Sequence, residues 1–309
     1  MSWSQISTKF SKYLTLTKRG FIVGVLILVF VFLGLIFAVP KPKEGNNFGH
    51  LEKNVAREST PAAIASPAAA LASSSPSPSP SPIPVYSGFC LNVPVIFYHH
   101  IQPLAEAKAQ GHGSLTVDSG IFDSQMAYLV SRGYHTISAD QLVAALAGHS
   151  GVPAKSIVVS IDDGYDDIHK YAYPIIQKYG IVTSLAIPTG LMNNPGYMSW
   201  DQLREMTGSG KVFVYNHTWS HSNLAGATKD KAQYEVSTAK KQLAENLGKS
   251  SSVLFYPYGA TNNTVTQILA QNGYSAGFTT IGGTTQCDSF IMSLHRTRIG
   301  NAPLASYGL

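Results

Sequence analysis

The sequence predicts an α/β fold, a distorted (β/α) barrel that is either closed or incomplete, in the part of the chain after residue 86. From there on, short runs rich in Val, Ile, Phe and Tyr alternate with longer amphipathic runs. This alternation is typical of parallel strands joined by crossover helices. The number of such units favours a barrel over a small open sheet. In a barrel of this kind, the carboxyl ends of the strands meet at one face, where active sites lie.

The expected strands and helices follow one another along the chain. Strand-like runs cover residues 93–101, 134–138, 156–161, 181–187, 211–216, 252–257 and 275–280. Helix-like runs cover residues 119–133, 139–148, 166–180, 199–210, 228–248 and 261–273. In the first helix-like run, Phe122, Met126 and Leu129 share one helical face. Several of these runs end at a glycine, as helices commonly do.

The first 86 residues have a different character. Residues 21–39 form an unbroken apolar run, and a helix needs ~20 apolar residues to cross a bilayer. The basic residues before it predict that residues 1–20 are cytoplasmic and that the domain at 87–309 is exported. We expect an uncleaved membrane anchor; the alternative is a cleaved signal peptide, whose apolar core usually has about 7–15 residues. Residues 40–86, rich in Ser, Ala and Pro, predict a disordered, extended linker.

The charge and the cysteines restrict the possible partners and the compartment. The formal net charge is +5, but Lys9, Lys12, Lys18 and Arg19 lie in the first twenty residues without any acid. The rest of the chain is close to neutral, so no nucleic-acid partner is expected. Two cysteines, Cys90 and Cys287, stand near the two ends of the domain. An exported domain permits a disulfide between them; two free buried thiols are the alternative.

Polar residues stand at the ends of three expected strands. Asp162 and Asp163 follow the strand at 156–161, and His217 and His221 follow the strand at 211–216. On a helical turn or a tight loop, the four-residue spacing points both imidazoles the same way. Two imidazoles and one carboxylate are zinc-type ligands that leave a position open for water. We therefore expect Asp163, His217 and His221 to bind a divalent metal, with zinc the first candidate, and Asp162 to accept a proton. A plain turn with solvated acids is the alternative for the aspartates.

Three motifs carry a family resemblance. The stretches SIDDG (160–164), NHTWSH (216–221) and YPYG (256–259), in this order, resemble the first three motifs of the polysaccharide deacetylases. This family is the NodB-homology domain, also called carbohydrate esterase family four. PVIFYHHI (94–101) and MSWDQL (198–203) resemble its extracellular, membrane-anchored branch, which deacetylates poly-N-acetylglucosamine and peptidoglycan.

The resemblance implies a role for each motif residue. It implies a distorted (β/α) barrel that hydrolyses an N-acetyl group of a glycan amino sugar. It makes Asp162 the general base, and it makes Asp163, His217 and His221 the metal ligands. It places the backbone amide of Tyr258 at the developing oxyanion.

The sequence departs from the family pattern at two places. Phe255 stands where many members have an arginine that orients the base, so this role is either vacant or passes to Arg296 or Arg298. The last family motif is Leu-x-His, whose histidine is the general acid, whereas this chain has Met-Ser-Leu-His. His295 is therefore only an approximate match for the acid, and an ordinary strand histidine is the alternative.

Other residues near the expected strand ends are candidates for substrate contact. His99 and His100 end the first strand; one of them is expected to line the cleft, and we assign substrate binding to His100. Trp219 is expected to stack on a sugar ring, together with Tyr258, although core packing is equally typical of a tryptophan. Acids such as Asp166 and Asp167 are common in the first turn of a helix, so no chemistry is assigned to them.

The sequence therefore predicts a metal-dependent hydrolase that removes N-acetyl groups from an extracellular or cell-wall polysaccharide. Peptidoglycan and a poly-N-acetylglucosamine polymer fit equally well. The alternatives are an O-acetyl esterase on a polysaccharide and a non-catalytic glycan-binding module on the same fold. A phosphohydrolase is disfavoured, because no basic residues stand beside Asp162 or His217 in the sequence.

Overall fold

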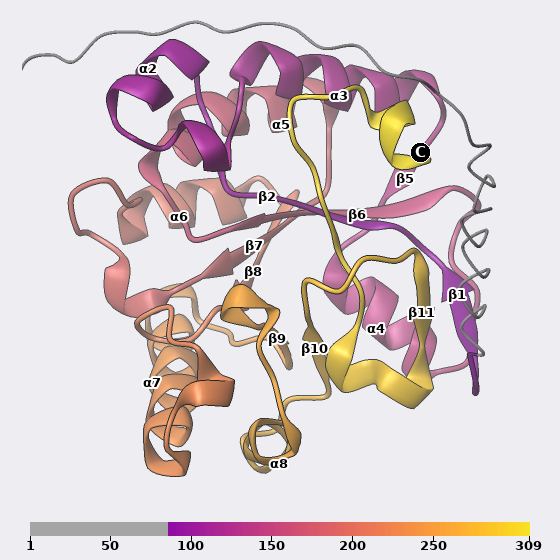
Figure 1. Ribbon diagram of the computed structural model, residues 1–309, viewed down its shortest axis with the longest axis vertical. Helices are drawn as coiled ribbons and strands as arrows, with labels where there is room; N and C mark the ends of the chain where they lie inside the picture. Colours follow the sequence, from indigo (N-terminus) through magenta and orange to yellow (C-terminus); the bar gives the residue numbers. More distant parts are fainter. Residues whose placement is uncertain (1–85) are drawn as a thin grey trace, which may run out of the picture. The chain divides into compact units, whose positions relative to one another are not determined.

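The structure is a computed structural model that describes residues 86–309 (Figure 1). The predictions for residues 1–20, 21–39 and 40–85 concern residues outside this range. Within 86–309, none of the helices is both long enough and apolar enough to cross a membrane.

A curled sheet of eight parallel strands forms the centre of the domain. The strand order is β10-β9-β8-β7-β6-β2-β12, and β5 pairs with the start of β6. These strands are β2 (Val95–Tyr98), β5 (His135–Thr136), β6 (Ser156–Asp162), β7 (Thr183–Ile187), β8 (Val212–Asn216), β9 (Val253–Phe255), β10 (Ala276–Phe278) and β12 (Thr297–Arg298). The parallel sheet confirms the fold class that the alternating pattern predicts.

Residues 294–299 connect the two edges of this sheet. Leu294 pairs with Phe278 of β10 at one edge, and Thr297 pairs with Ile96 of β2 at the other. The backbone N–H of Leu294 donates to the carbonyl of Gly277 at 2.8 Å. One short, irregular segment therefore spans the gap that a regular barrel fills with complete strands, which is the distortion expected for this fold.

Seven α-helices of the described range flank the sheet. They are α2 (Leu104–Ala109), α3 (Ser119–Ser131), α4 (Ala139–Ala147), α5 (Tyr173–Tyr179), α6 (Trp200–Gly208), α7 (Lys229–Leu247) and α8 (Asn263–Gln271). Helix α4 begins at a capping box formed by Ser138 and Gln141, and α6 begins at the equivalent pair Ser199 and Gln202. These caps satisfy backbone N–H groups that have no partner within the helix. Most helix boundaries lie close to those that the sequence pattern predicts.

Helix α5 departs from the single helix expected at 166–180. A π-helical turn at Ile168–Ala172 precedes it, and Pro174 lies in its first turn. Proline has no backbone N–H, and its ring crowds the carbonyl one turn earlier. The widened turn accommodates Pro174 and brings the chain out of β6 toward α5.

The two faces of the strands bury different partners. On one face, Ile96, Val159 and Leu185 belong to a core that also contains residues of α3, α5 and α6. On the other face, Val158 and Ala186 share a core with residues of α4. Because successive side chains of a strand alternate between the faces, the second set points into the curl of the sheet. The same face of β6 carries Ser160 and Asp162, so this alternation determines which residues enter the site.

A disulfide ties the start of the domain to its C-terminal part. Strand β1 (Cys90–Asn92) pairs antiparallel with β11 (Thr285–Cys287), and Cys90 and Cys287 form a disulfide. The structure thus brings together the two cysteines for which the sequence permits a bridge. A two-residue parallel pair, β3 (His100–Ile101) with β4 (Thr116–Val117), extends the chain beyond β2.

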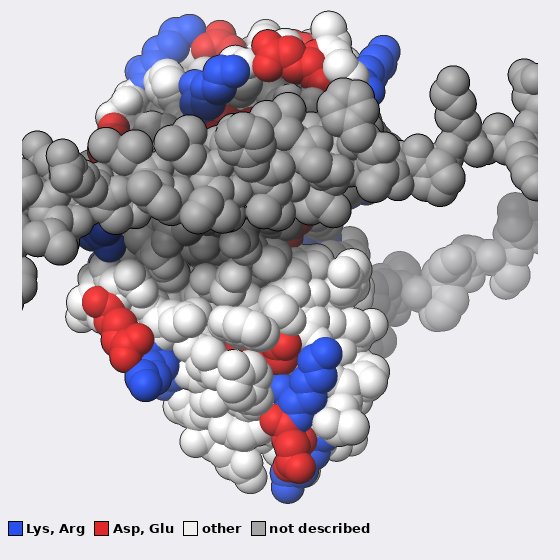
Figure 2. Space-filling view, turned by 90° about the vertical axis from the view of Figure 1, so that its left-hand side faces the viewer, with Lys and Arg blue, Asp and Glu red and all other residues white. Residues whose placement is uncertain are grey.

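The surface charges are interspersed on the face that Figure 2 shows. Outside the grey atoms, Lys and Arg side chains lie among Asp and Glu side chains rather than in one large patch of a single sign. Two of the ion pairs on the described surface lie within single helices, Lys241 with Glu245 in α7 and Arg204 with Asp201 in α6.

Candidate active site

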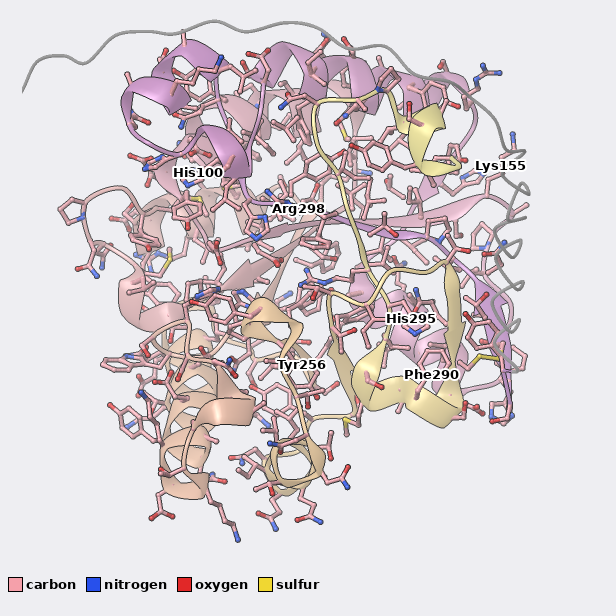
Figure 3. All side chains as sticks on the ribbon, in the orientation of Figure 1. His100, Lys155, Tyr256, Phe290, His295 and Arg298 are labelled. Carbon is pink, nitrogen blue, oxygen red and sulfur yellow. A yellow bond between two sulfur atoms is a disulfide. The ribbon has the colours of Figure 1, made fainter. Side chains whose placement is uncertain are left out.

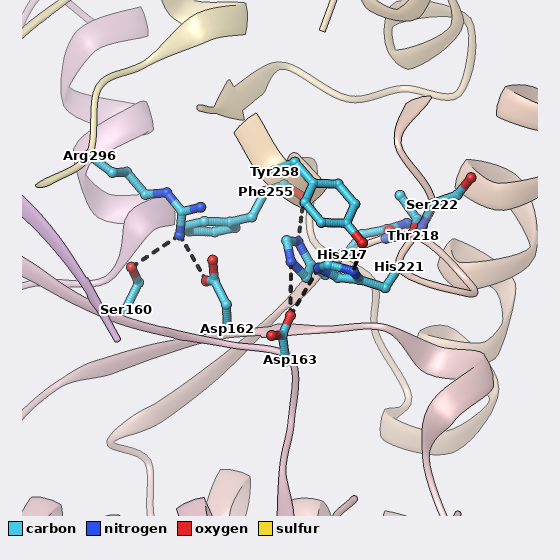
Figure 4. A network of polar contacts seen from close by, with 11 residues as sticks. Ser160, Asp162, Asp163, His217, Thr218, His221, Ser222, Phe255, Tyr258 and Arg296 are labelled. Carbon is cyan, nitrogen blue, oxygen red and sulfur yellow. Dashed lines mark hydrogen bonds and ion pairs between the residues drawn. The ribbon is translucent and has the colours of Figure 1, made fainter. Parts of the chain in front are cut away.

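The polar residues predicted for the site meet at the carboxyl ends of neighbouring strands (Figure 4). Asp162 is the last residue of β6, and Asp163 follows it. His217 follows β8, and the short turn at Pro257–Gly259, which contains Tyr258, follows β9. Because β6 to β9 are parallel neighbours, their ends bring these residues together, as expected from the sequence.

Asp163, His217 and His221 form one compact cluster. Each offers a ligand atom, and these atoms all lie within 4.8 Å of one another. The Oδ1 atom of Asp163 is 3.4 Å from Nε2 of His217 and 3.1 Å from Nε2 of His221. Asp163 and His217 are buried and His221 is half-buried. The cluster therefore opens toward solvent on the side of His221.

The hydrogen bonds of this cluster fit a bound cation. Nδ1 of His217 lies 2.7 Å from the carbonyl oxygen of Phe255. A carbonyl can only accept, so Nδ1 carries a proton, and a neutral His217 presents the lone pair of Nε2 to Asp163. Within residues 86–309, the buried Oδ1 of Asp163 has no hydrogen-bond partner. Lone pairs that face one another are stabilised by a cation between them, and two imidazoles with one carboxylate suit zinc.

The charge state of Asp163 agrees with this arrangement. Burial would raise the pKa of its carboxyl group, but the imidazoles of His217 and His221 beside it hold that pKa well below its usual range. The carboxylate is therefore ionised at neutral pH and available as a ligand.

Four residues at the site have a left-handed backbone, although none is a glycine. Asp163 has φ of 74°, Thr218 of 67°, His221 of 59° and Tyr258 of 60°. Such a conformation costs of order 1–3 kcal/mol per residue and persists where the surroundings fix it, commonly at functional sites. The backbone strain thus coincides with the side-chain cluster.

Asp162 lies in a different environment, fully enclosed and paired with Arg296. The Nη1 atom of Arg296 donates to Oδ1 of Asp162 at 2.8 Å, and the two residues are 1% and 2% exposed. The Nε atom of Arg296 donates to the carbonyl of Thr279 at 2.8 Å. The guanidinium lies over the rings of Phe97 and Phe255, at 4.4 and 4.9 Å from their centroids. These contacts hold the guanidinium rigidly against the carboxylate.

This pairing determines the charge of Asp162 and the role of the arginine. Burial would raise the pKa of Asp162, but Arg296 and, to a lesser extent, His217 bring that pKa below its usual value. Arg296 therefore makes the contact with Asp162 that Phe255 cannot make. Arg298, the other candidate, is exposed and donates to the carbonyl of Ser114 at 2.8 Å.

Of the two histidines after β2, His99 is the one that the structure brings to the site. Burial lowers its pKa, while the charges of Asp162 and Asp163 act to raise it, so both carboxylates are near its ring. Its Nδ1 atom is buried and has no hydrogen-bond partner in the part of the chain that the structure describes. The sequence indicates that one histidine of this pair lines the cleft, but it does not show which one.

The structure does not support the substrate contact predicted for His100. This residue is 4% exposed, its Nδ1 atom bonds to Oδ2 of Asp167, and its ring stacks on Tyr165 and His112. Figure 3 shows His100 far from His295 and Phe290 in this view. Asp167 is likewise not a solvated acid of a first helical turn, because it is buried and also accepts from the N–H of Ile101. His100 and Asp167 thus form a buried pair.

His295 is not brought into the cluster either. Its ring stacks on Phe290 at 4.7 Å between centroids, beside Gly283, and Figure 3 shows it next to Phe290 and away from His100. Because neighbouring side chains of an extended segment point to opposite sides, the contact of Arg296 with Asp162 turns His295 away. The general-acid role predicted for His295 gains no support from this placement.

The predicted sugar-contacting aromatic residues differ in exposure. Trp219 is half-buried; its indole packs on Gly190 and meets the ring of Tyr234 edge-on at 5.5 Å, which agrees with the packing alternative. Tyr258 is 66% exposed, and its hydroxyl lies 3.2 Å from Nδ1 of His221. Tyr258 therefore forms an exposed rim beside the cluster, as a substrate-contacting residue would.

Two further tyrosines, for which the sequence predicts no role, stand near the cluster. The rings of Tyr165 and Tyr197 lie 5.3 Å apart. Burial and then the charge of Asp163 raise the pKa of both hydroxyls. The position of Tyr165 directly after the motif SIDDG is the only sequence signal for either residue.

The motif residues lie in a region that matches a known family. Residues 149–277 match the family model described as polysaccharide deacetylase. This match identifies a polysaccharide deacetylase domain in the chain. The chain is therefore a hydrolase of the deacetylase class. The matched range contains both aspartates, both histidines of the cluster, and Tyr258, whereas Arg296 and His99 lie outside it.

Individual relatives agree with this assignment. The chain is 27% identical over 207 residues to a Bacillus subtilis (strain 168) protein named as a polysaccharide deacetylase, which covers 67% of this chain and 71% of the relative. It is 26% identical over 251 residues to the poly-beta-1,6-N-acetyl-D-glucosamine N-deacetylase of Escherichia coli, with 67% of this chain but only 36% of that protein covered. Among solved structures, the Streptococcus pyogenes deacetylase PplD in complex with acetate superposes with a TM-score of 0.65 at 26% identity, over 70% of this chain and 97% of that chain.

Proposed function

We propose that this polysaccharide deacetylase removes N-acetyl groups from an amino-sugar polysaccharide outside the cytoplasm, with a divalent metal, zinc first, at Asp163, His217 and His221. One observation carries the proposal. Two adjacent carboxylates have separate partners, the guanidinium of Arg296 for Asp162 and two imidazoles for Asp163. Each carboxylate can therefore serve a different purpose at the same time.

In this proposal Asp162 is the general base. Its carboxylate is ionised and fixed by Arg296, so it can take a proton from the water that attacks the acetyl carbon. A positioned general base contributes typically 10²–10⁴-fold to the rate. A bound cation of the zinc type lowers the pKa of water to about 7 and polarises the carbonyl oxygen.

We assign the proton donor for the leaving nitrogen to His99 rather than to His295. When the C–N bond breaks, the amine needs a proton, and an acid must stand near the base. His99 lies within the electrostatic reach of both carboxylates, whereas the ring of His295 packs on Phe290. Burial leaves the pKa of His99 below its ordinary value although both carboxylates act to raise it, so the imidazole must gain a proton within the site before it donates one to the amine and returns to the neutral form.

The oxyanion contact proposed for Tyr258 concerns its backbone. Tyr258 adopts a left-handed conformation inside the turn at Pro257–Gly259. A backbone N–H held in such a rigid turn can donate to the developing oxyanion without reorganisation. The side chain of the same residue lies against His221 at the exposed rim.

The substrate class is supported by relatives. The Escherichia coli and Staphylococcus aureus proteins to which the chain is similar carry the name poly-beta-1,6-N-acetyl-D-glucosamine N-deacetylase. A polymer of N-acetylated amino sugars, either such a polymer or peptidoglycan, is accordingly the proposed substrate. Cleavage of O-acetyl esters at the same site is the second candidate, because the same base and metal would serve it.

The proposed location rests on the sequence and on the disulfide. The apolar run at 21–39 and the Ser- and Pro-rich linker support an anchored domain outside the cytoplasm. The Cys90–Cys287 disulfide supports an oxidising compartment, where such bonds persist.

The test is an acetate-release assay on the full chain in detergent. The substrates are poly-N-acetylglucosamine, peptidoglycan, chitooligosaccharides and acetylxylan, each tested with enzyme as purified, after chelation, and after zinc is restored. We expect zinc-dependent acetate release from at least one N-acetylated polymer. Release from acetylxylan alone would instead favour the esterase, and release that survives complete chelation would contradict the metal-dependent proposal.

A further inference from the structure

The loop that carries both histidines of the cluster has neither helical nor strand structure. Residues 217–223 form no regular element, and Thr218 and His221 both have left-handed backbones. A segment of this kind does not hold its own shape through repeated backbone hydrogen bonds. Something outside the loop must fix the two imidazoles in a geometry that faces Asp163.

Glu235, in the N-terminal half of helix α7, makes this connection. Its carboxylate accepts from the N–H of Trp219 at 3.0 Å, from the N–H of Ser220 at 2.8 Å and from the hydroxyl of Ser220 at 2.6 Å. The three donors belong to two of the three residues between His217 and His221. Glu235 is only 2% exposed, and a buried carboxylate needs partners of this kind.

A second set of contacts anchors the start of the loop to the same helix. The Oδ1 atom of Asn216 accepts from the N–H of Thr218 at 2.7 Å, and its Nδ2 donates to the carbonyl of Val236 at 3.1 Å. The N–H of Ser222 donates to the hydroxyl of Thr218 at 3.0 Å. These bonds fix the two ends of the loop, so the middle depends on Glu235.

We infer that Glu235 is a positioning residue for the metal centre. Its carboxylate fixes Trp219 and Ser220, and through them the relative orientation of the His217 and His221 imidazoles. The inference rests on the proposed metal site, because its effect is exerted through those two ligands. Groups that orient metal ligands from behind typically contribute 10–100-fold to metal affinity.

Two substitutions can distinguish an effect of the hydrogen bonds of Glu235 from an effect of its negative charge. A glutamine at this position can accept both N–H groups through its oxygen, while its amide donates to the Ser220 hydroxyl, which reverses its role. Positioning by hydrogen bonds is therefore preserved in Glu235→Gln and lost in Glu235→Ala. If only the negative charge of Glu235 mattered, the two variants would be equally impaired.

The experiment measures the zinc dissociation constant of the full chain by competition with a chromophoric chelator. Glu235→Ala should bind zinc 10–100-fold more weakly than the wild type, and Glu235→Gln should stay within about threefold of the wild type. Glu245→Ala is the matched control, since Glu245 is an exposed acid of the same helix that pairs with Lys241. Its affinity should not change. The absorption spectrum of the cobalt-substituted protein should change in Glu235→Ala alone.

The melting temperature of the metal-free proteins provides a second readout. A purely structural role would lower that temperature in Glu235→Ala while the zinc affinity stayed at the wild-type value, and this result would overturn the inference. If Glu235→Ala does not fold, Ser220→Ala removes one of the three bonds and should weaken zinc binding by a smaller factor; unchanged affinity there would overturn the inference as well. A wild-type protein that binds no zinc would overturn the metal site itself, which is a distinguishable failure.

Discussion

The two adjacent aspartates of the site lie in surroundings that differ in burial and in the groups that face each carboxylate. Asp162 is enclosed with a guanidinium that is clamped between two phenylalanine rings and a backbone carbonyl. Asp163 faces two imidazoles, one of which is half-buried and stands on a loop with left-handed backbone. The positive partner of Asp162 is a side chain of the protein itself. The ligand atoms of Asp163 and the two imidazoles instead face a shared point, where a metal ion would bind.

This difference indicates how one dipeptide can provide both a base and a metal ligand. A buried carboxylate with a fixed Arg partner stays ionised whether or not a cation is bound. A carboxylate beside neutral imidazoles is best compensated by a cation. The base side of the site (Asp162 and Arg296) should therefore be fully formed in the metal-free protein. The ligand side (Asp163, His217 and His221) should instead change when metal binds. Substitutions on the two sides should accordingly differ in their effects on turnover and on zinc binding.

The largest effect is expected when a ligand is removed. His217→Ala and His221→Ala should each lose stoichiometric zinc and reduce acetate release to the background rate, because three protein ligands are needed to hold the metal. Elemental analysis and the acetate assay measure the two quantities on the same sample. His149→Ala is the control, because His149 is exposed and pairs with Asp288. Stoichiometric zinc in either ligand variant would rule out this assignment.

Removal of Arg296 should damage the base side and leave the ligand side intact. In Arg296→Met, Asp162 stays buried without its partner, and breaking a buried pair in this way costs about 3–5 kcal/mol of stability. Turnover should also fall, because the base is no longer oriented. Zinc affinity should change little, and a large loss of zinc would contradict the separation of the two regions.

The same variant should reverse the way in which Asp162 makes the stability of the metal-free protein depend on pH. In the wild type, the folded pKa of Asp162 lies below its ordinary value of 3.8, so its stabilising contribution is complete above that pH and is lost as pH falls through the folded pKa. In Arg296→Met, burial is no longer outweighed, the folded pKa rises, and the variant should gain stability relative to the wild type as pH falls from neutral. Denaturant unfolding across this pH range measures the difference in free energy of unfolding between the wild type and Arg296→Met. A difference that does not depend on pH would argue against the pairing of Arg296 with Asp162.

A smaller effect is expected at the exposed rim. Tyr258→Phe removes the hydroxyl that lies 3.2 Å from Nδ1 of His221 and keeps the backbone amide. A hydrogen bond of this kind is worth about 0.5–1.5 kcal/mol, so zinc affinity should fall by roughly 2–10-fold. Tyr171→Phe, which loses a hydroxyl bound to Glu106, should not alter zinc affinity. Equal effects in the two variants would show that the Tyr258 hydroxyl does not support His221.

The smallest effect on turnover is expected from the disulfide. The Cys90→Ser/Cys287→Ser variant should keep its turnover to within about twofold, because the bond lies outside the site. Its stability should fall by as much as roughly 5 kcal/mol in the chain-entropy model, since the bond joins residues 197 positions apart. Denaturant unfolding measures this loss. Mass spectrometry of the exported protein after non-reducing digestion should show the bond, and two free thiols would contradict it.

The strand ends and their polar residues were predictable from the sequence because their signals are local. Asp162, Asp163 and His217 each follow a run of apolar residues that forms a buried strand. Parallel neighbours bring such positions to one face, so the motif spacing was enough to predict the cluster. The capping pairs of α4 and α6 were equally local, and the helix boundaries there followed the pattern.

The remaining features depend on contacts between distant parts of the chain. Arg296 reaches Asp162 because residues 294–299 connect β10 with β2. No local sequence pattern predicts that this segment joins the two edges of the sheet. His99 and His100 are adjacent, and only the path of the chain after β2 decides which one faces the carboxylates. His295 is turned outward for the same reason that Arg296 is turned inward. Glu235 and Asp167 look like ordinary helix-surface acids in the sequence, and only the fold buries them.

The most direct test of this contrast is a zinc titration of Asp162→Asn and Asp163→Asn beside the acetate-release assay. We predict that Asp162→Asn binds zinc with near wild-type affinity while its turnover falls by roughly 10²–10⁴, the usual contribution of a general base. Asp163→Asn should bind zinc much more weakly, because a neutral amide oxygen is a poorer ligand than a carboxylate. If Asp162→Asn loses zinc while Asp163→Asn retains it, the two roles are reversed, and Asp162 is the metal ligand rather than the base.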